Sequence, residues 1–294
     1  MDTDLPKLAV CNFQGEAEDL KRFAVKNGFA GVDWTFKTRD LPENECQESR
    51  LCKEIARLHP LEVRYHCAFK GIDVGDADVE KARDAVEIFA KVCRLVSKME
   101  GRYVTIHLGL GRTAMHGLSW DRTIGALTDL VGFADGLGVC VCLENLASGW
   151  SSRPELFEKL IRKSGAGITL DIGHARVSPS IESQYYVFED FVAPHESRVF
   201  NAHVYHEERE GRHLPPTDLS DMFDRLVLLD SLPCDWWVLE LREEQPLRAT
   251  LDVVRQFLYT KEHSCAAPAT AAGTGFIARK EAGAEGFPVH RIAG

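Results

Sequence analysis

Eight short apolar runs alternate with longer amphipathic stretches along this 294-residue chain. The runs are rich in β-branched residues, which favours buried strands. They span residues 7–13, 31–36, 62–69, 103–109, 139–146, 167–174, 198–206 and 236–242. Between them, apolar residues recur every three or four positions, as expected of helices that pack on a sheet. The pattern therefore predicts a parallel sheet covered by helices.

Eight strand-and-helix units are the number that closes a (β/α)8 TIM barrel. A doubly wound sheet also alternates strands and helices, but its usual nucleotide site needs a glycine-rich turn after the first strand. The segment CNFQGEAED at residues 11–19 lacks that turn, so we expect no organic cofactor. The pattern thus predicts an α/β fold with a single TIM barrel over residues 1–263.

The helical stretches and the C-terminal end add detail to this fold. The clearest helical patterns span residues 17–28, 78–100, 121–138 and 247–261. Gly28, Gly101 and Gly138 stand where a left-handed residue closes a helix. Residues 264–294 are rich in Ala and Gly with little periodicity, which predicts a low-complexity, flexible and disordered tail.

The charge balance narrows the classes of partner. Lys and Arg total 35 against 45 for Asp and Glu, a formal net charge of -10. A chain with this balance has no global positive field to attract a phosphate backbone or an anionic membrane surface. We therefore expect a small, polar substrate rather than nucleic acid or a membrane, and the oligomeric state stays open, a homo-oligomer included.

Cysteines and the N-terminus point to the cytoplasm. The nine cysteines are odd in number, and several lie in apolar runs, which is typical of reduced, buried thiols. Cys140 and Cys142 precede Glu144 by even steps, so we expect them in the barrel core rather than among metal ligands. The first residues are acidic where a signal peptide is basic, and no apolar run reaches about 18 residues. We therefore expect neither export nor a membrane span.

Six apolar runs in succession carry an imidazole or a carboxylate at or near their C-terminal ends. These residues are His66, His107, Glu144, Asp171, His203 and Glu240. In a barrel, the C-terminal ends of the strands converge on one face, where active sites are built. Any one of them alone is more often a hydrogen-bonded core residue, but six on one face indicate a site.

Burying several carboxylates and imidazoles together carries a large desolvation penalty unless a cation neutralises them. The apolar runs place no Lys or Arg among these residues to do so. Glu144, Asp171, His203 and Glu240 form a mixed set of oxygen and nitrogen donors. Such a set suits Mn²⁺, Mg²⁺, Co²⁺ or Zn²⁺, and we expect it to bind one divalent metal ion.

The motifs TIHLG, LENL, LDIGHA, NAHVYHEEREGRHLPP and LEL resemble the xylose isomerase-like barrel superfamily. That superfamily includes sugar isomerases and epimerases as well as the endonuclease IV group of DNA-repair nucleases. The resemblance runs from the first strand to the last helix, and its motifs are specific for the superfamily rather than for one member. It implies the same four metal ligands that the charge argument selects.

The first hypothesis is a metal-dependent isomerase or epimerase of a sugar, a sugar acid or a related polyol ketone. A metal that chelates two substrate oxygens acidifies the C–H between them and stabilises an enediolate. Glu144 and Glu240 would act as ligands and as the acid/base pair. By resemblance to ketose epimerases, His174 and Arg209 match positions that hold substrate oxygens.

One departure from those epimerases concerns the residue six positions after Glu144. The epimerases have a further glutamate there, whereas this chain has Trp150, which either stacks on a sugar or packs at the rim. The substrate contacts that we expect are His66, His107, His174, Arg209, His213 and Trp150. The identity of the substrate stays open.

The alternative is an endonuclease IV-like, multinuclear zinc enzyme that acts on abasic DNA. All eight residues that match ligands of that group are present: His66, His107, Glu144, Asp171, His174, His203, His213 and Glu240. The group also needs an Asp two residues before His213, and Gly211 stands there. His206 or Glu210 could substitute, although residues 206–213 also fit a solvated loop.

The rim loops favour a small substrate over DNA. Residues 177–191 and 206–213 are acidic or mixed in charge, whereas phosphate contacts need Lys and Arg. A third hypothesis is a barrel that binds a metabolite without catalysis, since a fold alone does not establish chemistry. The presence of both Glu144 and Glu240 argues against it, because binding alone needs no acid/base pair.

Overall fold

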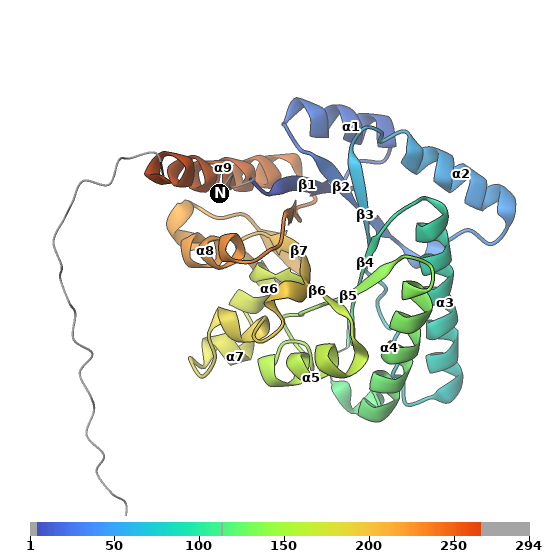
Figure 1. Cartoon of the computed structure of the whole chain (residues 1–294). Helices are drawn as coiled ribbons and strands as arrows, with labels where there is room; N and C mark the ends of the chain where they lie inside the picture. The colour runs from blue at the N-terminus through green and yellow to red at the C-terminus, as the bar shows by residue number, and fades with distance from the viewer. Residues whose placement is uncertain (1–4, 113, 266–294) are drawn as a thin grey trace, which may run out of the picture.

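The eight apolar runs form the eight strands of one closed, parallel barrel, as predicted (Figure 1). The computed structural model describes residues 5–112 and 114–265. The barrel strands are β1 (Lys7–Cys11), β2 (Gly31–Phe36), β3 (Glu62–Cys67), β4 (Tyr103–Ile106), β5 (Cys140–Glu144), β6 (Gly167–Asp171), β7 (Val199–Val204) and β10 (Trp236–Leu239). Their order around the barrel is β1-β10-β7-β6-β5-β4-β3-β2, so barrel strands that follow one another in sequence are paired, and β1 closes the ring with β10.

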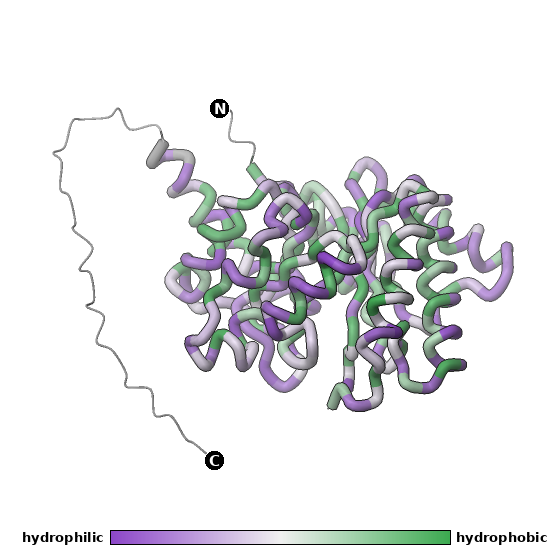
Figure 2. Tube along the Cα trace, turned by 60° about the horizontal axis from the view of Figure 1, so that its bottom comes forward, coloured by the Kyte–Doolittle hydropathy of each residue, from purple (hydrophilic) through white to green (hydrophobic). Residues whose placement is uncertain are grey.

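Helices lie outside this ring of strands (Figure 1). They are α1 (Ala17–Lys26), α2 (Glu45–Ala56), α3 (Val79–Lys98), α4 (Trp120–Asp135), α5 (Pro154–Ser164), α6 (Ile172–Arg176), α7 (Pro179–Glu182), α8 (Phe223–Ser231) and α9 (Glu244–Cys265). In α3, Asp78 caps the first turn, and the buried residues Ala82, Ala85, Phe89 and Val96 recur at helical spacing. Hydrophobic and hydrophilic residues accordingly alternate along the helices (Figure 2).

Within the described ranges, no helix has the length and apolar character needed to cross a membrane. Helix α9 ends at Cys265, two residues beyond the predicted boundary of the barrel at residue 263. The predicted tail lies, from residue 266 on, outside the described residues. Free thiols are buried at Cys67, Cys93 and Cys142, whereas Cys46 is exposed, so burial does not extend to every cysteine.

Two of the three predicted glycine caps are correct. Gly28 and Gly138 adopt φ values of 66° and 74°, in the left-handed region. At the end of α3, the left-handed residue is instead Glu100, with a φ of 58°. Gly101 is needed for space, because a Cβ on it would lie 2.3 Å from Cε2 of Tyr65.

Residues 206–213 are not the solvated loop that their composition suggests. They contain a two-stranded antiparallel hairpin of β8 (Glu207–Arg209) and β9 (Arg212–Leu214). Glu210 and Gly211 form its turn with φ values of 52° and 72°, which is the geometry of a tight hairpin turn. The register pairs Glu208 with His213. The turn therefore decides which acidic side chain lies beside His213.

A buried arginine lies inside the barrel, contrary to the prediction that the strands place no Lys or Arg among their polar residues. Arg64 of β3 is 5% exposed, and its guanidinium lies over the rings of Tyr103 and Trp236. It donates to the carbonyl of Phe200 and to Oδ1 of Asn201. Arg64 precedes His66 by two residues, so its side chain belongs to a layer nearer the N-terminal ends of the strands.

That deeper layer is a closed hydrogen-bond network. Asn201 donates from Nδ2 to Oγ1 of Thr169 at 3.2 Å, and the hydroxyls of Thr105 and Thr169 lie 2.7 Å apart. Together with Arg64, these residues form what we call the lower layer. Each of its members precedes by two positions a residue of the predicted site, and successive even positions share one face of a strand.

Candidate metal centre

The four predicted metal ligands converge at the C-terminal ends of their strands. Glu144 and Asp171 end β5 and β6, His203 is the penultimate residue of β7, and Glu240 directly follows β10. Their exposed fractions are 1%, 0%, 0% and 3%. One donor atom from each lies within 4.8 Å of the others. Four residues that are far apart in sequence thus form one buried cluster, which we call the upper layer.

His203 occupies the middle of this cluster. Its Nδ1 lies 3.2 Å from Oε2 of Glu144, 3.1 Å from Oε2 of Glu240 and 3.9 Å from Oδ2 of Asp171. Neither carboxylate oxygen of Glu144 and neither ring nitrogen of His203 has a hydrogen-bond partner among the described residues. Buried polar atoms without partners are costly. A divalent cation fits this donor set and would give partners to the Glu144 carboxylate and to one ring nitrogen of His203.

The electrostatics of the cluster favour bound positive charge. Burial opposes ionisation of Glu144, but His203 and His107 outweigh it and hold the pKa of that carboxyl well below its ordinary value. Burial likewise lowers the pKa of His203, but Glu144 and Glu240 raise it well above normal. Burial raises the pKa of Asp171 to about 6. The cluster therefore attracts cations, either as protons on its imidazoles or as a metal ion.

Asn145 and Tyr205 hold Asp171 in place, and neither was identified from the sequence. The amide of Asn145 accepts from the backbone N–H of Asp171 and donates to its carbonyl, at 2.8 Å each, which ties the ends of β5 and β6 together. Tyr205 donates from its hydroxyl to Oδ2 of Asp171 at 3.0 Å. Gly173 leaves room for this tyrosine, since a Cβ there would lie 2.1 Å from Cε2 of its ring.

A second group of donors consists of His66, His107 and Glu144. Nε2 of His107 lies 3.0 Å from Oε2 of Glu144 and 3.2 Å from Nε2 of His66. The other ring nitrogen of His107, Nδ1, lies 3.2 Å from the carbonyl of Cys67 and can donate to it. Such a bond leaves the lone pair of Nε2 directed at Glu144. The structure thus brings both predicted histidines to the metal cluster.

A third group lies where the hairpin meets α6, and it consists of His174, Glu208 and His213. Nε2 of His174 lies 2.7 Å from Oε2 of Glu208, and Nε2 of His213 lies 3.9 Å from the same oxygen. The ring of His213 stacks on Tyr205 with a centroid distance of 3.9 Å. Glu208 therefore supplies a carboxylate to a group whose expected aspartate is replaced by Gly211.

The two substitutes suggested by the sequence do not fill this role. Nδ1 of His206 faces the guanidinium of Arg225 at 3.3 Å, and Glu210 lies in the exposed turn of the hairpin. Glu208 was missed because its position depends on the hairpin register. Alternation along β8 directs it toward His174 and could have identified it had the turn at residues 210–211 been recognised.

Two predicted substrate contacts do not join the cluster. Arg209 follows Glu208 on β8 and so points to the opposite face, where its side chain pairs with Glu207 and is 71% exposed. Trp150 packs edge-on against Trp120 with a centroid distance of 5.0 Å. Trp150 thus packs against a neighbouring ring, and its contact with a substrate stays a prediction.

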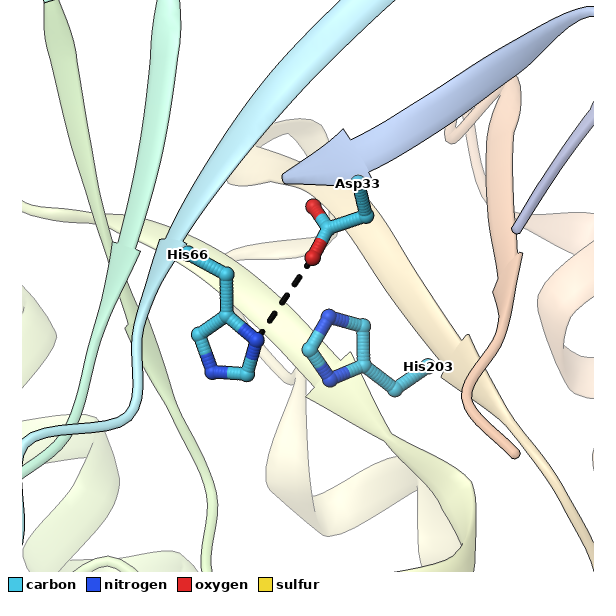
Figure 3. Close-up of side chains that lie close together, drawn as sticks. All are labelled: Asp33, His66 and His203. Atoms are coloured by element: carbon cyan, nitrogen blue, oxygen red, sulfur yellow. Dashed lines mark ion pairs between the residues drawn. The ribbon is translucent and has the colours of Figure 1, made fainter. Parts of the chain in front are cut away.

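Asp33 of β2 is a further buried carboxylate that sequence reasoning missed. It is 1% exposed, and its Oδ2 lies 3.5 Å from Nδ1 of His66 (Figure 3). With His66 and His203 it forms another group of potential ligand atoms. Asp33 resembles Glu144 in being a charged residue inside an apolar strand. It lies in the second strand, however, which is not one of the six runs that carry the predicted site residues.

Solved structures with low sequence identity share this fold. The chain is similar to a D-tagatose 3-epimerase-like protein, with a TM-score of 0.69 and 16% identity over 88% of this chain and 100% of the other. It is similar to an L-ribulose 3-epimerase, with a TM-score of 0.63 and 17% identity over 91% and 100%. It is also similar to endonuclease IV from Thermus thermophilus, with a TM-score of 0.61 and 18% identity over 87% and 100%.

Among curated proteins, the chain is 29% identical over 165 residues to an uncharacterized protein of Methanocaldococcus jannaschii. The match covers 56% of this chain and 70% of that protein. The model of the xylose isomerase-like TIM barrel family matches residues 22–258, which include every strand of the barrel from β2 on. The chain therefore belongs to the xylose isomerase-like TIM barrel family.

Proposed function

We propose that this protein is a metal-dependent isomerase or epimerase that acts on a sugar, a sugar acid or a related polyol ketone. The observation that carries the proposal is the pair of buried carboxylates, Glu144 and Glu240, which both lie beside Nδ1 of His203. Their strands, β5 and β10, are separated around the barrel by β6 and β7. A substrate bound beside this cluster would therefore meet carboxylates that come from two different parts of the barrel.

The ligands of the proposed metal site are Glu144, Asp171, His203 and Glu240. When bound, a divalent ion supplies positive charge that stabilises the enediolate formed when a C–H beside a carbonyl loses its proton. In the proposed reaction, one of the two glutamates removes this proton and the other returns a proton on the opposite side. Which glutamate acts first depends on the configuration of the substrate.

The imidazoles around the cluster suit the recognition of hydroxyl groups. His66, His107 and His174 are buried, and each has a ring nitrogen within 3.5 Å of a carboxylate oxygen of Glu144. A neutral imidazole can donate to one substrate oxygen or accept from one hydroxyl. The epimerases among the similar structures are named for the sugars D-tagatose and L-ribulose, which supports a substrate of this class.

The test is a screen for exchange of substrate hydrogen with solvent deuterium over ketoses, sugar acids and their phosphates. Nicking of abasic DNA is assayed in parallel on the same preparation. Exchange without nicking supports the proposal. Nicking without exchange favours the nuclease, and neither reaction with any substrate leaves a metabolite-binding barrel as the better account.

The second candidate is an endonuclease IV-like enzyme with several zinc ions, and Glu208 is the observation that favours it. With Glu208 beside His174 and His213, the third group of donors includes a carboxylate despite Gly211. The neighbouring groups of potential ligands, two of which share Glu144, could hold more than one ion. The lack of an aspartate at position 211 is therefore weaker evidence against a nuclease. The acidic net charge still favours a small substrate.

Counting metal ions separates the two candidates. Protein purified without chelators should contain about one divalent ion per chain if it is mononuclear, and two or three favour the second candidate. Glu208→Gln should lower the count only if the third group binds an ion. Glu207→Gln is a matched control, because Glu207 is adjacent in sequence but pairs with Arg209.

A further inference from the structure

A carboxylate in the second strand lies inside the barrel without a cationic partner of its own. Asp33 alternates with Val32 and Trp34, which face the helices, so it points into the barrel together with Thr35. Its Oδ2 has no hydrogen-bond partner among the described residues. A buried carboxylate is costly unless something interacts with its charge.

The strand register does not provide that interaction. Asp33 pairs across β2 and β3 with Arg64, but the guanidinium of Arg64 donates to Phe200 and Asn201 in the lower layer. Within the described ranges, the one ion pair of Asp33 that meets a 4.0 Å limit is with Nδ1 of His66, at 3.5 Å. Figure 3 shows the carboxylate directed at this edge of the imidazole, with His203 beside the pair.

The two nitrogens of His66 face different surroundings. Nδ1 faces Asp33 and, at 3.8 Å, Oε1 of Glu240, whereas Nε2 faces His107 and, at 3.5 Å, Oε2 of Glu144. A neutral imidazole carries one proton, on either nitrogen. If that proton is on Nε2, it faces Nε2 of His107 and Oε2 of Glu144, and Nε2 of His66 then has no lone pair to offer to a metal or substrate.

We propose that Asp33 is a positioning residue, which accepts the Nδ1 proton of His66 and thereby keeps the lone pair of Nε2 directed at Glu144 and His107. At 3.5 Å the contact is slightly longer than a hydrogen bond, and neither Oδ2 of Asp33 nor Nδ1 of His66 has another hydrogen-bond partner among the described residues. His107 is oriented in the same sense by the carbonyl of Cys67. Both imidazoles then present Nε2 to the same point beside Glu144.

The proposed role of Asp33 is to stabilise the tautomer of His66 that carries its proton on Nδ1, relative to the tautomer that carries it on Nε2. Carboxylates behind a histidine commonly fix its ring and raise its basicity as a ligand. The inference rests on the metal centre proposed above, which both candidate functions share. The tautomer itself can be measured in chelator-treated protein, so that a failure of this inference is distinguishable from a failure to bind metal.

The experiment records the nitrogen resonances of ¹⁵N-histidine-labelled protein after chelator treatment, at an alkaline pH where the ring carries one proton. The His66 signals are assigned by comparison with His66→Gln. We expect the proton of His66 on Nδ1 in the wild type and in Asp33→Asn, whose amide oxygen can still accept. In Asp33→Ala we expect the proton on Nε2, together with about 10- to 100-fold weaker binding of Zn²⁺.

Thr35→Val is the matched control, because Thr35 lies on the same face of β2, and its hydroxyl also has no partner among the described residues. This variant should leave the tautomer and the zinc affinity unchanged. A wild-type spectrum with the proton of His66 on Nε2 would overturn the proposal, even if Asp33→Ala does not fold. An unchanged tautomer in a folded Asp33→Ala variant would overturn it as well.

Discussion

The barrel contains two buried polar layers, and they differ in whether their polar atoms have hydrogen-bond partners. In the lower layer, Arg64 and Asn201 bond to each other, and the hydroxyls of Thr105 and Thr169 close the network. In the upper layer, both oxygens of Glu144 and both nitrogens of His203 lack hydrogen-bond partners among the described residues. The two layers are thus only two residues apart along each strand, but the polar atoms are hydrogen-bonded in the lower layer and lack partners in the upper one.

This difference teaches that polarity inside a barrel does not by itself indicate function. The lower layer has its own cation, Arg64, and needs nothing from outside. The upper layer concentrates carboxylates, and in the described part of the chain none of its three carboxylates forms an ion pair with Lys or Arg within 4.0 Å. We therefore expect changes in the lower layer to affect stability, and changes in the upper layer to affect metal binding and catalysis.

The largest expected effect is in the upper layer. Glu240→Gln keeps the size of the side chain but removes a proton acceptor, so turnover should fall by about 10²- to 10⁴-fold. The rate of deuterium exchange into substrate measures this loss, and circular dichroism checks that the fold is intact. Unchanged exchange in the variant would refute the proposed role of Glu240 in proton transfer.

In the lower layer, Arg64→Met should reduce the stability of the fold and leave metal binding unchanged. The variant loses the bonds to Phe200 and Asn201 and the contacts with the two aromatic rings, and we expect a loss of about 3 kcal/mol in the free energy of unfolding. Urea denaturation measures this change. The number of bound metal ions should stay the same, and a reduced number would show that the two layers are not independent.

Metal binding should stabilise the protein through the upper layer. At a free metal concentration of 100 times Kd, binding adds about 2.7 kcal/mol to the free energy of unfolding. Addition of Mn²⁺ or Zn²⁺ to chelator-treated protein should therefore raise Tm by several degrees. His203→Gln should lose this increase, and an equal rise of Tm in the variant would place the ion elsewhere.

The smallest expected effect comes from one hydroxyl of the lower layer. Thr169→Val removes an acceptor of Asn201 and a partner of Thr105, with an expected loss of about 1 kcal/mol in the free energy of unfolding. Scanning calorimetry measures the change. Because Thr169 precedes Asp171 by two residues on β6, a simultaneous loss of metal would mean that the network also supports the ligands.

The sequence predicted the barrel and the four upper-layer residues for the same physical reason. Strands buried on both faces are apolar runs, and a carboxylate such as Glu144 inside such a run is conspicuous. The eight strands and their closure are confirmed by the structure. The metal-binding and catalytic roles of these residues stay predictions.

Residues whose position depends on long-range pairing could not be predicted in this way. Glu208 reaches His174 only because the turn at Glu210 and Gly211 fixes the register of the hairpin. Tyr205 reaches Asp171 only because Gly173 leaves room for its ring. Asp33 and Arg64, by contrast, stood in recognised strands, and alternation along those strands could have identified both.

The near-complete burial of the upper layer has a consequence for the kinetics of metal exchange. Glu144, Asp171 and His203 are each at most 1% exposed, so an ion held by these residues would be largely shielded from solvent. We therefore expect exchange to be slow compared with purification. The ion found in the isolated protein would then reflect which metal was abundant when the chain folded, rather than the relative affinities of the site.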